Sequence, residues 1–230
     1  NSYHNIPKAD RGSAVAIGNF DGVHLGHQSV IDVARTAASQ AKAPLGVLTF
    51  EPHPRAYFAP QTPAFRLMSP VARQNRLTKL GVEYLYELPF NDSLAALTPE
   101  QFAREVISEG LGLTHVVIGQ DFCFGKARAG TAEDLLHFGE KMGFGVSIAP
   151  LLATKGAQVS STAIRTALSE GRPQDAAAML GHWHRLEGAV QHGEKRGREL
   201  GFPTANMHLT DLHLPKFGVY AVEVDVLTGP

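Results

Sequence analysis

The sequence predicts an α/β domain built on a parallel sheet, followed by a shorter segment of all-β type. Between Ala14 and Pro150, short apolar runs alternate with stretches in which apolar residues recur at helical spacing, as in βαβ units. Beyond Gly181 the pattern changes to short runs broken by glycine and charge, which is typical of a small β-barrel. We therefore expect two domains, residues 1–181 and 182–230.

The composition argues against nucleic-acid and membrane partners. Hydrophobic residues make up 43% of the 230 residues, enough for a real core, and the net charge of −1 gives no global basic field. The single cysteine, Cys123, excludes an internal disulfide framework and a multi-cysteine zinc site. No apolar run is long enough to cross a bilayer, and the polar start shows no leader pattern. We expect a cytoplasmic protein that binds small molecules.

The first strand, residues 14–17, leads into a glycine-rich turn and a helix whose periodicity covers residues 28–38. Residues 18–27 read Gly-Asn-Phe-Asp-Gly-Val-His-Leu-Gly-His. The glycines let the backbone approach a ligand, and the first turn of a helix presents N–H groups that favour an anion. His24 and His27 are three residues apart, so both imidazoles could reach one phosphate. Either histidine alone would be an ordinary turn residue, but the pair predicts a phosphate site.

This ten-residue stretch resembles the His-x-Gly-His signature of the nucleotidylyltransferase superfamily. Its longer form resembles that of the bacterial FAD synthetases, which are bifunctional riboflavin kinase/FMN adenylyltransferases. The resemblance implies a Rossmann-like nucleotidylyltransferase domain in which His24 and His27 are catalytic. It also implies that five other residues of the turn bind ATP and its phosphates: Gly18, Asn19, Phe20, Gly22 and Gly26.

A second strand, residues 44–50, precedes the loop Glu51-Pro52-His53-Pro54-Arg55. Strand, helix and strand at this spacing predict a parallel pair with a right-handed crossover. Ligands of such sheets bind beyond the carboxyl ends of the strands, which makes Glu51, His53 and Arg55 candidates to face the site. Each of them taken alone is more simply explained as a solvated loop residue.

The elements that follow continue the alternation. Residues 67–80 form a predicted helix that Ser69-Pro70 opens and Gly81 ends. A capping box, Thr98-Pro99-Glu100-Gln101, opens another predicted helix that runs to about residue 109. Further elements are a helix over 131–142 and strands over 82–88, 115–119 and 145–150. A last helix is expected over 173–180.

The loop after the fourth strand, residues 119–130, combines three glycines, two phenylalanines, an acid and two bases. Aromatic rings beside glycines form a slot for a flat heterocycle, and the bases could neutralise phosphate. The alternative is a structural loop fixed by its two aromatic rings. The segment resembles the Gly-x-Asp-Phe-x-Phe-Gly loop of bacterial FAD synthetases. That resemblance implies a flavin or nucleotide pocket made by Asp121, Phe122, Phe124, Gly125 and Arg128.

Three hydroxyl residues, Ser160, Ser161 and Thr162, stand just before a short helical stretch. Capping that helix needs only one hydroxyl, so the others are candidates to bind a phosphate at the helix start. Arg165 lies one turn further on and could reach the same anion with its planar fork of donors. The run resembles the Ser-Ser-Thr-x-Ile-Arg motif of the nucleotidylyltransferases. The resemblance implies that these hydroxyls hold ATP phosphates and that Arg165 is catalytic.

Residues 188–206 resemble the opening of the riboflavin kinase domain, with Gly-Phe-Pro-Thr-Ala-Asn as the core of the match. The resemblance implies that Gly193, Gly197 and Arg198 cover ATP phosphates. It also implies that Thr204 and Asn206, which offer hard oxygen ligands, bind Mg²⁺. A turn of purely geometric role is the alternative reading. The family's kinase base would lie downstream of the last motif, so we expect only part of this domain and doubt its kinase activity.

The four motifs together predict adenylyl transfer from ATP to FMN, giving FAD and pyrophosphate. ATP, FMN and riboflavin are the expected substrates, FAD the product and Mg²⁺ the cofactor, with riboflavin phosphorylation by a complete second domain. Two alternatives stay open. One is a nucleotidylyltransferase with another phosphate-bearing acceptor, and the other is a flavin-binding or regulatory module without turnover.

Overall fold

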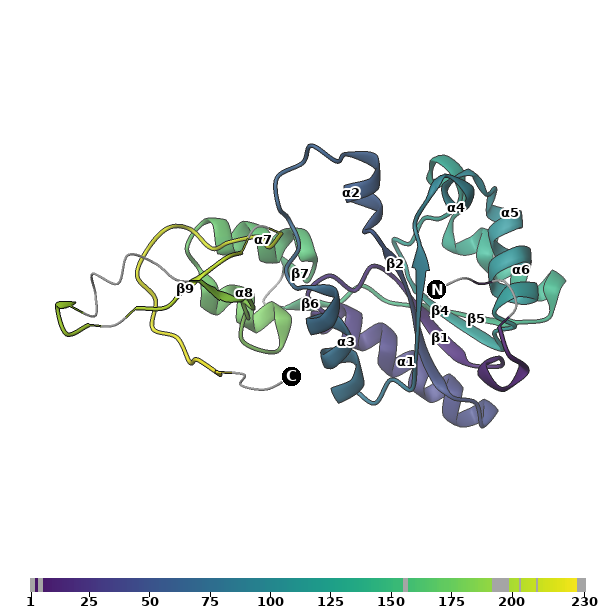
Figure 1. The fold of residues 1–230 in the computed structure, drawn as a ribbon. Helices are drawn as coiled ribbons and strands as arrows, with labels where there is room; N and C mark the ends of the chain where they lie inside the picture. Colours follow the sequence, from purple (N-terminus) through teal and green to yellow (C-terminus); the bar gives the residue numbers. More distant parts are fainter. Residues whose placement is uncertain are drawn as a thin grey trace.

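Five parallel strands form the centre of the computed structural model (Figure 1), which describes residues 3, 6–154, 157–191, 199–202, 204–209 and 211–226. The strand order is β3-β2-β1-β4-β5, and every neighbouring pair is parallel. The strand order reverses at β1, so a ligand crevice is expected beyond its carboxyl end. The predicted α/β parallel sheet is confirmed. The strands are β1 (Ala14–Ile17), β2 (Leu45–Glu51), β3 (Tyr84–Pro89), β4 (His115–Gly119) and β5 (Gly145–Ala149).

Helices cover both faces of this sheet (Figure 1). On one face, α1 (Leu25–Ala41) and α3 (Pro70–Lys79) pack on apolar residues that alternate along β1 and β2, such as Ala16 and Val47. On the other face, α4 (Asp92–Ala96), the π-helix η2 (Phe102–Gly110) and α6 (Ala132–Met142) pack on Ile17 and Leu48. Because successive strand residues point to opposite faces, one short strand serves both cores.

The predicted starts of α3 and α5 are confirmed. Ser69 caps α3 by accepting from the amide of Ala72, and Thr98 forms the predicted capping box at α5 (Pro99–Gln101). The helix expected to run on to about residue 109 continues from α5 as a π-helix, which no pattern in the sequence predicts. Nine residues make two and a half turns of an α-helix, which would place Phe102 and Leu111 on opposite faces. The wider η2 lets both side chains reach the core, where they are 4% and 0% exposed.

Two short helices were not predicted. The expected loop after β2 becomes α2 (Pro54–Phe58), which begins where His53 accepts from the amide of Arg55. The other is α4, which Asn91 caps. Both are five residues long, too short to show a helical period in the sequence.

A smaller helical unit follows the sheet. After the two-residue strands β6 (Ala153–Thr154) and β7 (Ala157–Gln158) come α7 (Ser161–Ser169) and α8 (Pro173–Leu180). Helices α7 and α8 share a core with Leu67, which lies just before α3. No helix of the described residues is long and apolar enough to cross a membrane.

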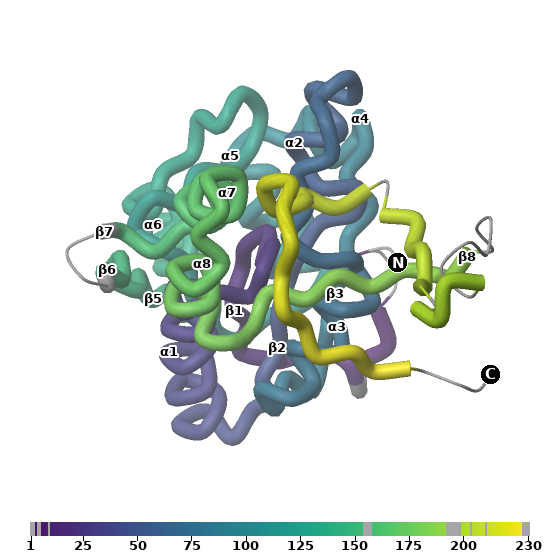
Figure 2. Tube along the Cα trace, turned by 90° about the vertical axis from the view of Figure 1, so that its left-hand side faces the viewer, coloured from purple at the N-terminus to yellow at the C-terminus, as the bar shows by residue number. Residues whose placement is uncertain are grey.

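The region after Gly181 is only sparsely regular. Among its described residues, the strands expected from residue 186 onward are limited to one antiparallel pair, β8 (Val190–Gln191) with β9 (Asn206–Met207). The chain then returns to the first part of the molecule. Figures 1 and 2 both show the yellow C-terminal segment beside α7 and α8. Leu212 there forms a parallel bridge with Arg66 and is 7% exposed.

Candidate functional site

The two histidines of the glycine-rich turn stack on each other at the entry of α1, with His24 buried and His27 half-buried. His24 caps the helix, because its Nδ1 accepts from the amide of His27 at 3.2 Å. This cap explains why α1 begins at Leu25, before the periodicity starts. The two imidazole centroids lie 3.6 Å apart, and the His27 ring also tilts against Phe20 at 5.0 Å. Within the described part of the chain, the buried Nδ1 of His27 has no hydrogen-bond partner.

Glycines make this arrangement possible. Gly22 has a φ of +87°, and a Cβ there would lie 2.8 Å from Cδ1 of Leu67. A Cβ at Gly26 would lie 3.1 Å from the His24 ring, and one at Gly18 would lie 3.3 Å from the Phe20 ring. Part of the glycine pattern therefore serves packing within the turn itself, in addition to any approach by a ligand.

Asp21 joins this turn to the distant helix α7. Its carboxylate is 5% exposed and accepts from the Leu67 amide at 2.8 Å and from Nη1 of Arg165 at 2.9 Å. Its backbone oxygen accepts from Oγ of Ser161 at 2.8 Å. Burial raises the pKa of Asp21, and the Leu67 amide and the Arg165 guanidinium oppose that effect. The sequence assigns Asp21 no role, since its only signal there is an acid inside an anion-binding turn.

Each of the three hydroxyls at the start of α7 has its own partner. Ser160 caps the helix by accepting from the Ala163 amide at 3.1 Å, so one hydroxyl does suffice for capping. Ser161 donates to Asp21, and Oγ1 of Thr162 accepts from Nη2 of Arg165 at 3.4 Å. The hydroxyls therefore organise the Asp21–Arg165 pair, and their contact with ATP phosphates stays a prediction.

Arginines gather at the carboxyl end of β2, around the loop that sequence reasoning had marked. Glu51 accepts from Arg66 and, at 3.2 Å, from Arg73, which also binds Glu87 at 2.7 Å. The Arg73 side chain is 3% exposed and sits between the two carboxylates. No motif marks Arg66 or Arg73 in the sequence, because only the fold brings them to this edge.

The other two candidates of this loop also lie near α7. The guanidinium carbon of Arg55 lies 4.8 Å from the centroid of the Phe65 ring, and that of Arg165 lies 5.8 Å from it. Burial lowers the pKa of His53 to about 4, and the charges of Arg66 and Arg165 add to the effect. Glu51, His53 and Arg55 thus lie at the same edge of the sheet as Arg165. The surplus of guanidinium groups makes this edge suited to a polyphosphate.

The phenylalanine loop is fixed from within. Phe124 is 6% exposed, packs on Phe102 with centroids 5.6 Å apart, and exchanges two backbone hydrogen bonds with Gly130. Phe122 stacks on Phe124 at 5.7 Å and is half-buried. Phe124 therefore anchors the loop in the core, as the structural reading required. Asp121 and Arg128 are exposed, Gly125 has a φ of +72°, and the assignment of these residues to a flavin or nucleotide pocket stays a prediction.

The kinase-like motif is only partly described. Gly193, Gly197 and Arg198 lie outside the described residues. Thr204 and Asn206 are exposed, and Asn206 pairs with Gln191 in the β8–β9 ladder. No group of three or more histidine, cysteine, aspartate or glutamate residues that could hold a metal occurs in the described ranges. The assignment of Thr204 and Asn206 as Mg²⁺ ligands stays a prediction.

Comparison with known proteins identifies the family of this chain. A sequence model of the FAD synthetase family matches residues 6–163. The match includes the histidine turn, the loop after β2 and the hydroxyls at the start of α7, and it ends two residues before Arg165. The chain belongs to the FAD synthetase family. A riboflavin kinase model matches residues 180–229, so both expected parts of the resemblance are confirmed.

Relatives of this family match nearly the whole chain. A bifunctional riboflavin kinase/FMN adenylyltransferase of Pseudomonas fluorescens is 40% identical over 97% of this chain and 71% of its own length. The protein of the same description from Bacillus subtilis (strain 168) is 38% identical, with the same two coverages. A crystal structure from Streptococcus pneumoniae, described as a macrolide-efflux protein, has a TM-score of 0.83 at 34% identity, covering 95% of this chain and 71% of that one.

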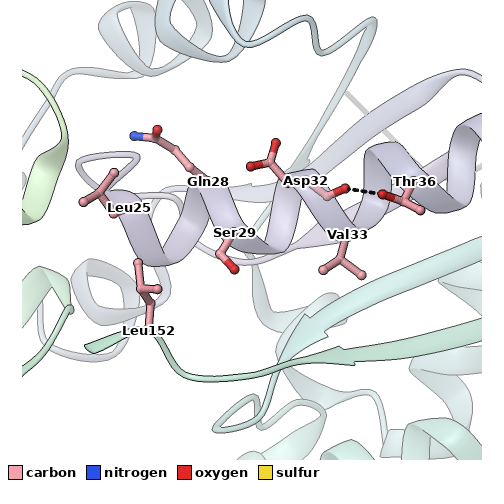
Figure 3. A pocket seen from close by; sticks show the side chains of 7 residues that line it. All are labelled: Leu25, Gln28, Ser29, Asp32, Val33, Thr36 and Leu152. Atoms are coloured by element: carbon pink, nitrogen blue, oxygen red, sulfur yellow. Dashed lines mark hydrogen bonds between the residues drawn. The ribbon is translucent and has the colours of Figure 1, made fainter. Parts of the chain in front are cut away.

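A groove of about 450 Å³ runs along α1 (Figure 3). Asp32 is the one charged side chain in its lining, and the hydroxyl of Thr36 donates to the backbone oxygen of Asp32 at 3.0 Å. Leu25 is the one residue of the 18–27 motif in the lining of the groove, which does not include His24 or His27. Its lining consists of Leu25, Gln28, Ser29, Asp32, Val33, Thr36 and Leu152.

The lowered pKa values of His24 and His53 predict that the free energy of unfolding decreases as the pH falls. Burial lowers the pKa of both His24 and His53 from 6.5 to about 4. Between these values the unfolded chain takes up a proton on each histidine and the folded chain does not, so stability present at pH 7 is lost as the pH falls. We expect each histidine to cost about 1–2 kcal/mol of unfolding free energy by pH 5. Urea denaturation at pH 7 and pH 5 measures the loss.

Two matched variants show whether His53 causes part of this loss of stability. His53→Gln should lose less stability than the wild type between pH 7 and pH 5, whereas His137→Gln, at an exposed position of α6, should match the wild type. An identical pH dependence in all three proteins would contradict the assignment.

Proposed function

We propose that the chain transfers the adenylyl group of ATP to FMN, forming FAD and pyrophosphate. The observation that carries the proposal is the Asp21–Arg165 ion pair of 2.9 Å, which brings the hydroxyl–arginine motif against the histidine turn. Membership of the FAD synthetase family supports this reading, as do relatives described as bifunctional riboflavin kinase/FMN adenylyltransferases. We assign the transfer to residues 1–181.

In this proposal the protein stabilises charge and takes no covalent part. An oxygen of the FMN phosphate attacks the α-phosphorus of ATP, the bond to the bridging oxygen of the β-phosphate breaks, and pyrophosphate leaves with that electron pair. The task of the site is to hold both phosphates in line and to neutralise charge on the transferring group.

The two motifs divide this work. Burial lowers the pKa of His24 to about 4 and that of His27 well below its usual value, and the Arg165 guanidinium further disfavours the cationic form of His24. Both rings are therefore neutral at pH 7 and bind phosphate oxygens as N–H donors. Positive charge comes from Arg165 and the arginines of the β2 edge. Thr162 accepts from Arg165, and Ser161 holds the backbone of Asp21, the counter-ion of Arg165.

Mg²⁺ would accompany ATP and would supply further charge neutralisation when bound. In the second part, the hydroxyl of Thr204 and the amide oxygen of Asn206 are hard donors, are exposed, and fit such a cation. We propose that residues 182–230 belong to a riboflavin kinase domain that makes FMN from riboflavin and ATP. The proposed partners are these small molecules, in the cytoplasm.

One assay tests the proposed function. The purified chain is mixed with FMN, ATP and Mg²⁺, and FAD and pyrophosphate are quantified by chromatography and a coupled phosphate assay. We expect equal amounts of the two products and none when Mg²⁺ is chelated. Tight FMN binding without FAD would favour a binding module, and the absence of any response to FMN would favour another acceptor. Either result would overturn the proposal.

A further inference from the structure

The segment 211–216, from the kinase-like part of the chain, lies directly on the helix that carries Arg165 (Figure 2). The backbone amide of His213 donates to the backbone oxygen of Arg66 at 2.7 Å, and the amide of Lys216 donates to that of Leu168 at 2.9 Å. The buried side chain of Leu212 completes the attachment. The segment therefore bridges α7 and the strand-like stretch before α3.

The imidazole of His213 reaches the backbone of Arg165 itself. Its Nε2 lies 3.1 Å from the backbone oxygen of Arg165 and 3.1 Å from Oγ of Ser169. A carbonyl oxygen can only accept, so this contact is a hydrogen bond when Nε2 carries the hydrogen, as in the Nε2–H tautomer. In a helix the first lone pair of that carbonyl serves the amide four residues on, and the imidazole uses the second.

A second contact from beyond Gly181 reaches the other motif. Nε2 of His182 lies 3.1 Å from the backbone oxygen of Gly22, in the turn that holds His24 and His27. Gln28, inside α1, donates to the backbone oxygens of Val23 and Leu180 at 2.9 and 3.0 Å. Both halves of the adenylyl-transfer site are thus held in part by residues at or after the domain boundary.

We propose that His213 is a positioning residue for adenylyl transfer, acting through α7 on the orientation of Arg165. This inference rests on the proposed function of the Arg165 site and deepens it. The kinase-like part then contributes to the first reaction through segment 211–216. Any change that detaches this segment from α7 leaves the orientation of Arg165 less fixed and thereby weakens ATP binding.

The test compares three variants of the 230-residue chain. His213→Leu removes the donor, His213→Gln places an amide donor near the position of Nε2, and His208→Leu is the control at an exposed histidine of the same region. Calorimetry measures ATP binding, and steady-state assays measure FAD formation. We expect His213→Leu to weaken ATP binding about fivefold and to lower kcat/KM for ATP about tenfold, with the KM for FMN within about twofold. His213→Gln should recover to within about threefold of the wild type.

Two results would overturn the inference. One is that His213→Leu, with an unchanged melting temperature, behaves as His208→Leu does. The other is an Nδ1–H tautomer of His213 in ¹⁵N NMR of the wild-type imidazoles, which needs no variant to fold. A wild-type chain that binds ATP but makes no FAD would contradict the proposed function alone, because calorimetry and NMR still decide the role of His213.

Discussion

Replacing His27 by alanine is expected to lower the turnover number for FAD formation about 100- to 1000-fold. The His27 imidazole is neutral, stacks on His24, and keeps a buried nitrogen that no group in the described structure engages. Such a preorganised group costs little reorganisation when charge develops on the transferring phosphoryl group. FMN binding should weaken only a few-fold, since the interaction strengthens in the transition state. Stopped-flow turnover and fluorescence titration with FMN measure the two effects.

His137→Ala is the matched control for this experiment, because His137 is an exposed histidine on α6 outside both motifs. It should leave turnover and FMN binding at wild-type values. Equal losses of turnover and FMN affinity in His27→Ala would mean that His27 contributes only ground-state binding. Melting temperatures of both variants separate these effects from a loss of folded protein.

Replacing Asp21 by alanine should damage both stability and activity. Asp21 and Arg165 have side chains only 6% and 16% exposed, so removing the carboxylate leaves a mostly buried guanidinium without its counter-charge. The Leu67 amide also loses its acceptor. We expect the free energy of unfolding to fall by about 3 kcal/mol and kcat/KM for FAD formation to fall at least about 100-fold. Urea denaturation and the FAD assay measure the two losses.

Two comparisons sharpen the Asp21 experiment. Asp21→Asn keeps an acceptor for Leu67 but removes the charge, so it should recover part of the stability and little of the activity. Asp32→Ala breaks an exposed pair with Arg35 and should change the unfolding free energy by less than about 0.5 kcal/mol. An Asp21→Asn variant with wild-type kcat/KM would show that the ion pair does not position Arg165.

The sheet and the helix starts could be predicted because their signals are local. Apolar runs mark β1, β2 and β4, and side-chain caps mark the starts of α3, α5 and α6 within four residues of sequence. The π-helix could not be predicted, since it depends on where Leu111 meets the core. Short helices such as α2 carry no measurable period, and the structure alone reveals them.

The site divides in the same way. The two motifs are visible in the sequence, but the ion pair between Asp21 and Arg165 that joins them is not. Asp21 meets Arg165 only because the fold closes a loop of 144 residues, and Arg73 reaches Glu51 and Glu87 only across the edge of the sheet. Phe124 was assigned to a pocket by its motif, whereas the structure also gives it a place in the core. A motif specifies residue types, but the packing of the fold determines whether each side chain lies in the core or at the site.

The contacts that complete this site have a consequence for synthesis of the chain. The bond from Ser161 to Asp21 spans 140 residues, that from Arg165 spans 144, and that from His182 to Gly22 spans 160. The histidine turn emerges from the ribosome early, and the five strands of the parallel sheet, β1 to β5, all precede residue 150. A nascent chain can therefore form its sheet well before α7 exists to meet Asp21. The contacts that α7 makes with the histidine turn therefore form only after the sheet.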